Sequence, residues 1–142
     1  MNRGFHSPLR RELVDHPINK LVDVLVYVDR YGRRWVVPIG FHGDSASIPF
    51  PFRMALPRHG RYSRPAWLHD WLFTTRPVGL RESNMLMMDA MRDDRVRRSQ
   101  RWPIRAGLLV GSWLPWWRHK VLPENERFVD WYRRHPIPQK LR

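Results

Sequence analysis

The sequence predicts one α+β domain, in which an N-terminal β-hairpin or small sheet packs on a central helix and further helices follow. Two short runs rich in valine and leucine flank a connection that contains glycine, a pattern typical of a β-hairpin. A later segment is apolar on nearly every side when it is drawn as a helix, which indicates a buried, central position. The chain has 142 residues, of which 42% are hydrophobic. Its length and composition therefore suit a single domain with a substantial core.

The N-terminal part is expected to contain an arm, the hairpin and a loop. Residues 1–19 are polar and interrupted by proline, so we expect an N-terminal arm before a globular domain at residues 20–134. The hairpin strands are expected at residues 21–28 and 35–39, on either side of the glycine-containing turn. Residues 40–60 are rich in proline and glycine and are expected to form a structured loop.

Four helices are expected after the loop, at about residues 65–73 and 81–92, from residue 103 to near residue 115, and from residue 123 onward. Pro65, Pro103 and Pro123 each suit the first turn of a helix, and Pro115 is expected to disrupt the third helix. The second helix carries four methionines, which are typical of an adaptable core. A basic tail with prolines follows at residues 135–142.

The charge balance is strongly basic. Lysine and arginine outnumber acidic residues by 26 to 13, which gives a formal net charge of +13. Such a surplus favours an acidic partner, whether nucleic acid, an anionic membrane or an acidic protein surface, although a solvated basic surface explains it equally. The chain has no cysteine, which excludes disulfides, thiolate catalysis and cysteine-ligated zinc. The longest apolar stretch, residues 104–117, is shorter than the ~20 residues of a membrane-spanning helix, so we expect no transmembrane segment.

Two motifs combine polar and apolar residues in an unusual order. They are GFHGDSASIP at residues 40–49 and LHDWLF at residues 68–73. Together with RESN at residues 81–84, they resemble the domain-of-unknown-function family 1353, which is found in phages and in bacterial genomes that carry prophages. The resemblance covers about residues 20–92 and implies a phage protein.

The chain departs from the usual pattern of that family at several polar positions. Gly43 stands in place of threonine, Phe73 in place of tyrosine, and Asn84 in place of an aspartate on the second helix. The polar residues that remain in the motifs are the candidate catalytic residues, His69, Asp70 and Asp44.

The His-Asp pair is also similar to that of secreted phospholipases and parvovirus capsid phospholipase domains. That resemblance implies that His69 is a general base and that Asp44 or Asp70 binds a divalent metal such as calcium. The residue that orients the histidine would be Asn84, whose amide cannot stabilise an imidazolium as a carboxylate does. In a structural interpretation, the same polar residues pin the loop to the helix through hydrogen bonds. The substitutions at Asn84 and Phe73 favour the structural interpretation, so neither catalysis nor a bound cofactor is expected.

The C-terminal third is rich in tryptophan with interleaved basic residues. Tryptophan and arginine together are typical of the anchors of protein interfaces. An aromatic core, stacking on single-stranded nucleic acid and a membrane interface remain alternative explanations. The candidate interface residues are Trp113, Trp116, Trp117, Arg118 and Trp131.

The expected function is that of a structural protein of a phage particle, in the tail or at its connection to the head. Its expected partners are other phage structural proteins, and its expected locations are the virion and, during assembly, the host cytoplasm. One alternative is a metal-dependent hydrolase of the cell envelope or of lipid esters that uses His69 as its base. The other is a protein that binds nucleic acid through its basic surface.

Overall fold

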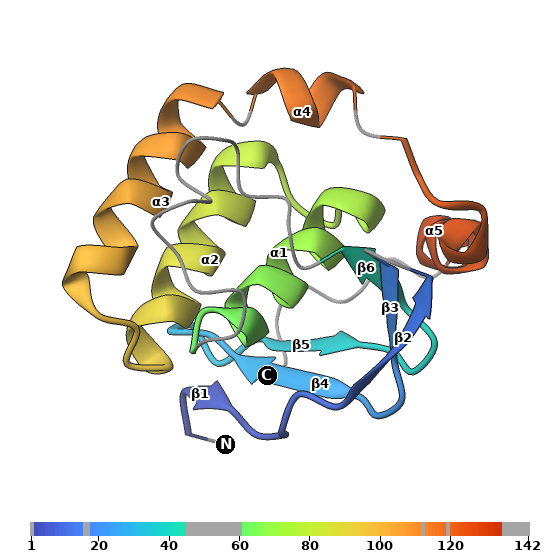
Figure 1. The fold of residues 1–142 in the computed structure, drawn as a ribbon, viewed down its shortest axis with the longest axis horizontal. Coiled ribbons are helices and arrows are strands. Elements are labelled where there is room, and N and C mark those ends of the chain that lie inside the picture. Colours follow the sequence, from blue (N-terminus) through green and yellow to red (C-terminus); the bar gives the residue numbers. More distant parts are fainter. Residues whose placement is uncertain (1, 16–17, 45–60, 112, 119, 135–142) are drawn as a thin grey trace.

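The computed structural model describes residues 2–15, 18–44, 61–111, 113–118 and 120–134. Strands occupy the N-terminal part of the chain and helices the rest (Figure 1), so the predicted α+β class is confirmed. Most of the loop expected at residues 40–60 and the tail expected at residues 135–142 lie outside the described residues.

The strands form two small antiparallel sheets. The first sheet has the order β1-β4-β5 and contains β1 (Gly4–Phe5), β4 (Leu25–Val28) and β5 (Arg34–Val37). The second has the order β2-β3-β6 and contains β2 (Arg11–Asp15), β3 (Ile18–Leu21) and β6 (His42–Asp44). β4 and β5 pair from Leu25↔Val37 to Val28↔Arg34, and Gly32 in their turn has a φ of 75°, which favours glycine. The predicted hairpin is therefore confirmed, with shorter strands than expected.

The segment expected to be an arm contributes two strands instead. β1 pairs with β4 through Gly4↔Val28 and Phe5↔Tyr27, and β2 pairs with β3. A two-residue strand is too short to show an alternating pattern. In β2 the last four of five residues are exposed, so its sequence does not alternate between apolar and polar residues as a half-buried strand does.

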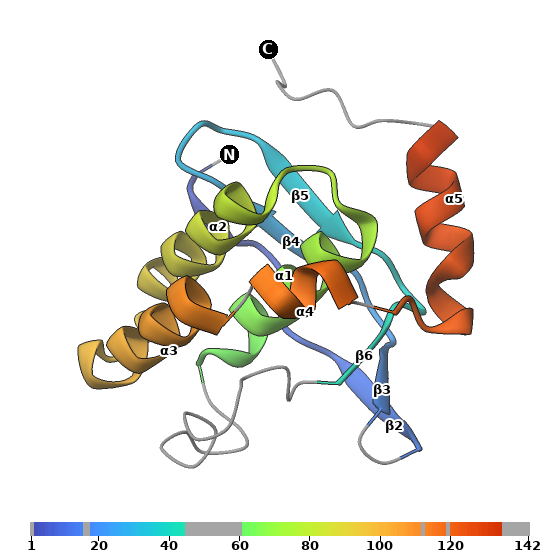
Figure 2. The same ribbon diagram turned by 90° about the horizontal axis from the view of Figure 1, so that it is seen from above.

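Five α-helices and a short 3-10 helix follow in the described chain. They are α1 (Ser63–Thr75), α2 (Leu80–Asp93), α3 (Arg98–Gly111), α4 (Trp113–Arg118), η2 (Pro123–Asn125) and α5 (Glu126–Arg134). α1 lies at the centre, between the sheets and the other helices (Figures 1 and 2). The first two predicted helices are confirmed and extend slightly further at each end.

The third helix begins earlier than predicted. α3 starts at Arg98 and contains Pro103 in its interior, so the expectation that Pro103 marks its first residue was wrong. Proline is also found beyond the first position of a helix, where it removes one backbone hydrogen bond. α3 ends at Gly111, four residues before Pro115, and a proline ring clashes with the carbonyl of the residue four positions earlier.

The core has two parts. The larger cluster joins both sheets to α1 and includes Tyr27, Trp35, Phe41, Trp67 and Leu72. The smaller one lies between the start of α1, α2 and α3, and consists of Tyr62, Met87, Met91, Val96 and Ile104. α1 is apolar around nearly its whole circumference because it contacts these clusters on nearly every side.

Candidate functional site

The two sequence motifs meet in the structure. β6, which carries residues 42–44 of the first motif, lies against α1, which carries the second. A Cβ atom built on Gly43 would lie 2.6 Å from Asp70 Oδ2 and 3.0 Å from Trp67 Cζ3. The Asp70 carboxylate is therefore in direct contact with the strand that contains Asp44, whose backbone pairs with Ile18.

His69 is buried between α1 and α2. Only 9% of the residue is exposed, and its Nε2 donates a hydrogen bond of 2.9 Å to Asn84 Oδ1 on α2. Its ring packs on Phe73, with 4.6 Å between centroids. Burial lowers the pKa of His69 to about 4, and the hydrogen bond to Asn84 offsets only part of that effect. His69 is therefore neutral at physiological pH and ties the two helices together.

This arrangement suits a structural role better than general-base catalysis. A base with so low a pKa removes protons weakly near pH 7, and its partner is an amide rather than a carboxylate. In the part of the chain that the structure describes, no group of three or more histidine, aspartate or glutamate side chains is placed to hold a metal ion. The low pKa of His69 and its amide partner are the observations that favour the structural interpretation of the motif.

The candidate interface residues fall into different environments. Trp116 packs edge-to-face on Phe73, with 5.0 Å between centroids, and the Arg76 guanidinium lies 4.6 Å from its ring centroid. Trp117 is 76% exposed and Trp131 is 53% exposed. Arg118 is also exposed, and Trp113 is placed in α4 by its backbone. Trp116 thus belongs partly to the interior, while Trp117, Arg118 and Trp131 face outward.

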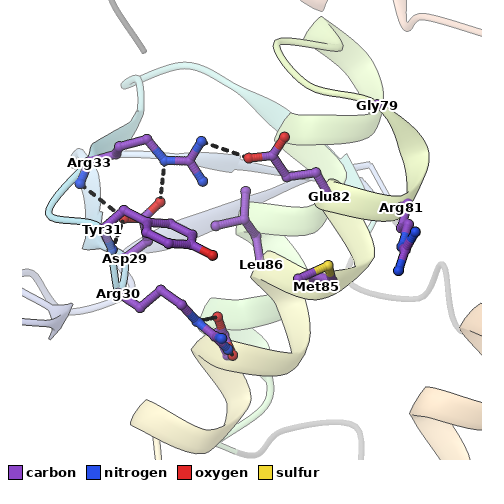
Figure 3. Close-up of a pocket in the computed structure, with 10 residues that line it drawn as sticks. Asp29, Arg30, Tyr31, Arg33, Gly79, Arg81, Glu82, Met85 and Leu86 are labelled. Carbon is purple, nitrogen blue, oxygen red and sulfur yellow. Dashed lines mark hydrogen bonds and ion pairs between the residues drawn. The ribbon is translucent and has the colours of Figure 1, made fainter. Parts of the chain in front are cut away.

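A pocket of about 350 Å³ lies between the β4–β5 turn and α2, and Figure 3 shows its lining side chains. Arg33 joins its two sides, because its Nη1 donates to Glu82 Oε1 at 2.6 Å while its Nε donates to Asp29 Oδ2 at 2.6 Å. Arg30 binds Asp89 on α2, with 2.7 Å from its Nε to Asp89 Oδ2. From the sequence, residues 29–32 were expected only to connect the hairpin strands, and Glu82 and Asp89 only to lie on the second helix.

Asp29 is the acceptor that organises the turn. It is 2% exposed and receives hydrogen bonds from the backbone N–H groups of Tyr31 and Arg33, from Arg33 Nε and from Trp35 Nε1, at 2.6 to 3.0 Å. Burial opposes its ionisation, but the hydrogen bonds outweigh that effect and hold the pKa of Asp29 below its ordinary value. A fully bonded, ionised aspartate of this kind fixes a turn.

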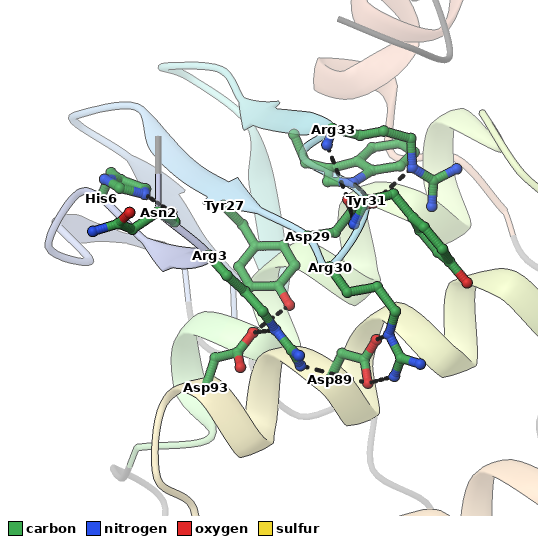
Figure 4. A network of polar contacts seen from close by, with 11 residues as sticks. Asn2, Arg3, His6, Tyr27, Asp29, Arg30, Tyr31, Arg33, Asp89 and Asp93 are labelled. Carbon is green, nitrogen blue, oxygen red and sulfur yellow. Dashed lines mark hydrogen bonds and ion pairs between the residues drawn. The ribbon is translucent and has the colours of Figure 1, made fainter.

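The same side of α2 binds the N-terminal segment (Figure 4). Asp93 Oδ2 accepts hydrogen bonds from Arg3 Nε at 2.8 Å and from Tyr27 Oη at 2.7 Å. Burial, together with this hydrogen bond to Asp93, raises the pKa of the Tyr27 hydroxyl. The acidic residues of α2 are thus used to attach the first sheet.

A larger pocket of about 600 Å³ lies between α2 and α3. Its lining combines arginines with apolar side chains: Arg81, Met85, Met88, Arg92, Arg105 and Leu109. Asn84 also lines it, so the His69–Asn84 pair lies directly behind its wall. The sequence held a signal for this groove, since residues 81, 85, 88 and 92 are spaced by three or four, as on one face of a helix.

No described helix has both the length and the apolar character that crossing a membrane requires.

Comparison with known proteins places the chain in a family. No curated protein and no solved structure matches the chain. A family model described as "Protein of unknown function (DUF1353)" matches residues 19–107, which run from the second strand of the β2–β3 pair into α3 and make up more than half of the chain. His69, Asp70 and Asn84 all lie within the matched residues. Because the match covers more than half of the sequence, the chain belongs to the DUF1353 family.

Proposed function

We propose that this protein is a non-catalytic structural component of a phage particle, located in the tail or at its connection to the head. The observation that carries the proposal is the number of large apolar side chains left exposed among basic residues. Among those in the helical part of the chain are Trp117 at 76%, Leu109 at 71%, Trp102 at 67% and Trp131 at 53%. Exposed apolar groups of this size, mixed with arginine, are typical of protein interfaces.

Two further features support the proposal. The motifs resemble a family found in phages and prophages, which favours a particle as the setting. The buried polar residues of those motifs fasten elements to one another, as the neutral His69 does between α1 and α2. A protein whose buried polar residues hold its elements together, and whose surface exposes large apolar side chains, suits assembly better than catalysis.

The test is quantitative mass spectrometry of purified particles, with the major tail and portal proteins as internal standards. We expect this protein at a fixed copy number relative to them, as symmetric assembly requires. Washing the particles at high salt serves as the control for basic proteins that adhere nonspecifically. Absence from washed particles would contradict the proposal.

A metal-dependent hydrolase remains the alternative, and one observation favours it: Gly43 brings the strand of Asp44 against Asp70. This function predicts ester hydrolysis that depends on a divalent ion and disappears in His69→Gln while the protein stays folded. Turnover that is unchanged in the folded His69→Gln variant would exclude His69 as the base.

A further inference from the structure

The groove between α2 and α3 has a repeated composition on both walls. On α2, Arg81, Met85, Met88 and Arg92 share one face, since they are spaced by four, three and four residues. On α3, Arg105 and Leu109 line the groove and are spaced by four residues. Both walls of the groove therefore place arginines next to large apolar side chains.

The arginines of this groove are available to a ligand. Arg30, which joins the first sheet to α2, is paired with Asp89. By contrast, within the described residues no hydrogen bond or ion pair holds the side chains of Arg81, Arg92 or Arg105. All three line the groove, so they place unneutralised positive charge around it.

The apolar residues of the groove are also incompletely covered. Met85 is 45% exposed and Leu109 is 71% exposed, and Met88 and Leu108 are partly buried against the smaller core cluster. Methionine-rich surfaces adapt to the apolar face of a bound helix. α2 and α3 have 14 residues each, so each wall is about 20 Å long, which matches several turns of a docked helix.

We propose that the α2–α3 groove binds an acidic amphipathic helix of another protein. The apolar face of that helix would cover Met85, Met88 and Leu109, and acidic residues on its flanks would pair with Arg81, Arg92 and Arg105. Nucleic acid fits the charge but not the aliphatic floor, because phosphates and bases gain little from methionine and leucine. As a contact inside a particle, this inference rests on the proposed function; as a binding property, it stands on the groove alone.

The experiment uses fluorescence anisotropy with two labelled probes and the full-length protein. One probe is a helical peptide with leucines at i, i+4 and i+7 and glutamates on the flanks. The other is a single-stranded DNA oligonucleotide of the same net charge. A peptide of identical composition, rearranged so that its leucines do not share a face, controls for charge alone.

The variants separate the two components of the groove. Arg105→Glu removes positive charge and Leu109→Ser removes apolar contact, and both side chains are exposed. Arg133→Glu is the matched control, because it makes the same charge change at a side chain that is 77% exposed on α5. α5 lies on the other side of the molecule from α3 (Figures 1 and 2).

We expect saturable binding of the amphipathic peptide that weakens about tenfold in Arg105→Glu and in Leu109→Ser and stays unchanged in Arg133→Glu. Three results would overturn the inference: no binding, equal binding of the rearranged peptide, or tighter binding of the oligonucleotide that ignores Leu109→Ser. Particle composition tests the proposed function separately. If the protein binds the peptide but is absent from particles, the binding groove stands and the proposed function fails. If the protein is present in particles but does not bind the peptide, only the groove is refuted.

Discussion

At the scale of single residues, His69 illustrates how a catalytic residue type serves a structural purpose. The residue is 9% exposed and hydrogen-bonded to a neutral amide at 2.9 Å. Protonation would place a charge in the interior with no carboxylate to receive it, which is unfavourable. The substitution of Asn84 for an acidic residue is consistent with a histidine that stays neutral.

The stability of the protein should therefore fall in mild acid because of His69. Its pKa is about 4 when folded against 6.5 for the free side chain, so between these values the unfolded chain binds a proton that the folded chain excludes. Proton uptake by the unfolded state favours unfolding as pH decreases. The stability is fully present above pH 6.5 and is lost towards pH 4, by on the order of 3 kcal/mol.

Urea denaturation at a series of pH values checks this prediction. His69→Gln keeps a donor for Asn84 but cannot be protonated, so its free energy of unfolding should vary less between pH 6.5 and 4 than that of the unaltered protein. The low pKa of Asp29 acts only at lower pH, below the ordinary value of an aspartate, and does not interfere. Equal pH dependence in both proteins would contradict a neutral, buried His69.

The sequence motifs drew attention to His69, Asp70 and Asn84 but could not describe their partners. His69, Asp70 and Asn84 were noticed because they belong to recognisable motifs, and the structure places Asp70 against Gly43. The Asp29 network was missed because Asp29 to Arg33 has the composition of any polar turn. Only the fold shows that Asp29 is buried with four donors around it.

At the scale of elements, the sequence predicted those whose pattern is strong. The β4–β5 hairpin was found from two apolar runs around a glycine-containing turn, α1 from an apolar run that follows Pro65, and α2 from methionines at helical spacing. β1 and β2 were missed because one is two residues long and the other is largely exposed. The start of α3 was misplaced because Pro103 was treated as a first residue, whereas the helix begins at Arg98.

A buried asparagine and an aromatic contact attach α5 to the rest of the domain. Asn125 is 1% exposed, its Oδ1 accepts a hydrogen bond of 2.9 Å from the His42 N–H, and its Nδ2 donates one of 2.7 Å to the His42 carbonyl. The side chain thus pairs with β6 as a neighbouring strand would. Phe128 completes the contact by packing edge-to-face on Phe41 and Trp71.

Asn125→Ala should therefore loosen α5 without unfolding the domain. The substitution leaves two backbone groups of His42 without partners, which costs about 2 kcal/mol. Hydrogen exchange should show amides of α5 exchanging on the order of tenfold faster, while those of α1 and α2 stay protected. Glu124→Ala, at an exposed position of the same 3-10 helix, is the control and should have no effect. Unchanged exchange in α5 would mean that the aromatic contact alone holds it.

At the scale of the whole molecule, the residues matched by the family model include only some of the exposed apolar side chains. The matched residues, 19–107, contain the hairpin, α1, α2 and all of α3 except its last four residues, and therefore most of the α2–α3 groove. α4, η2 and α5 lie beyond the match and carry Trp117 and Trp131. The family match thus covers most of the interior, and Trp117 and Trp131 lie on segments outside it.

The proposed role in assembly predicts that Trp117 matters for incorporation but not for folding. Trp117 is 76% exposed, so Trp117→Ala removes little that is buried in the isolated protein, and its thermal unfolding should stay within about 2 °C of the unaltered protein. Buried in an interface, the same ring is worth about 2 kcal/mol or more. In a phage that depends on a plasmid copy of the gene, mass spectrometry should therefore find several-fold less of the variant in purified particles.

Tyr31→Ala is the matched control, because Tyr31 is an aromatic residue 69% exposed in the β4–β5 turn, away from α4. Equal incorporation of Trp117→Ala would remove α4 from the contact surface and leave the α2–α3 groove as the place to look for the partner.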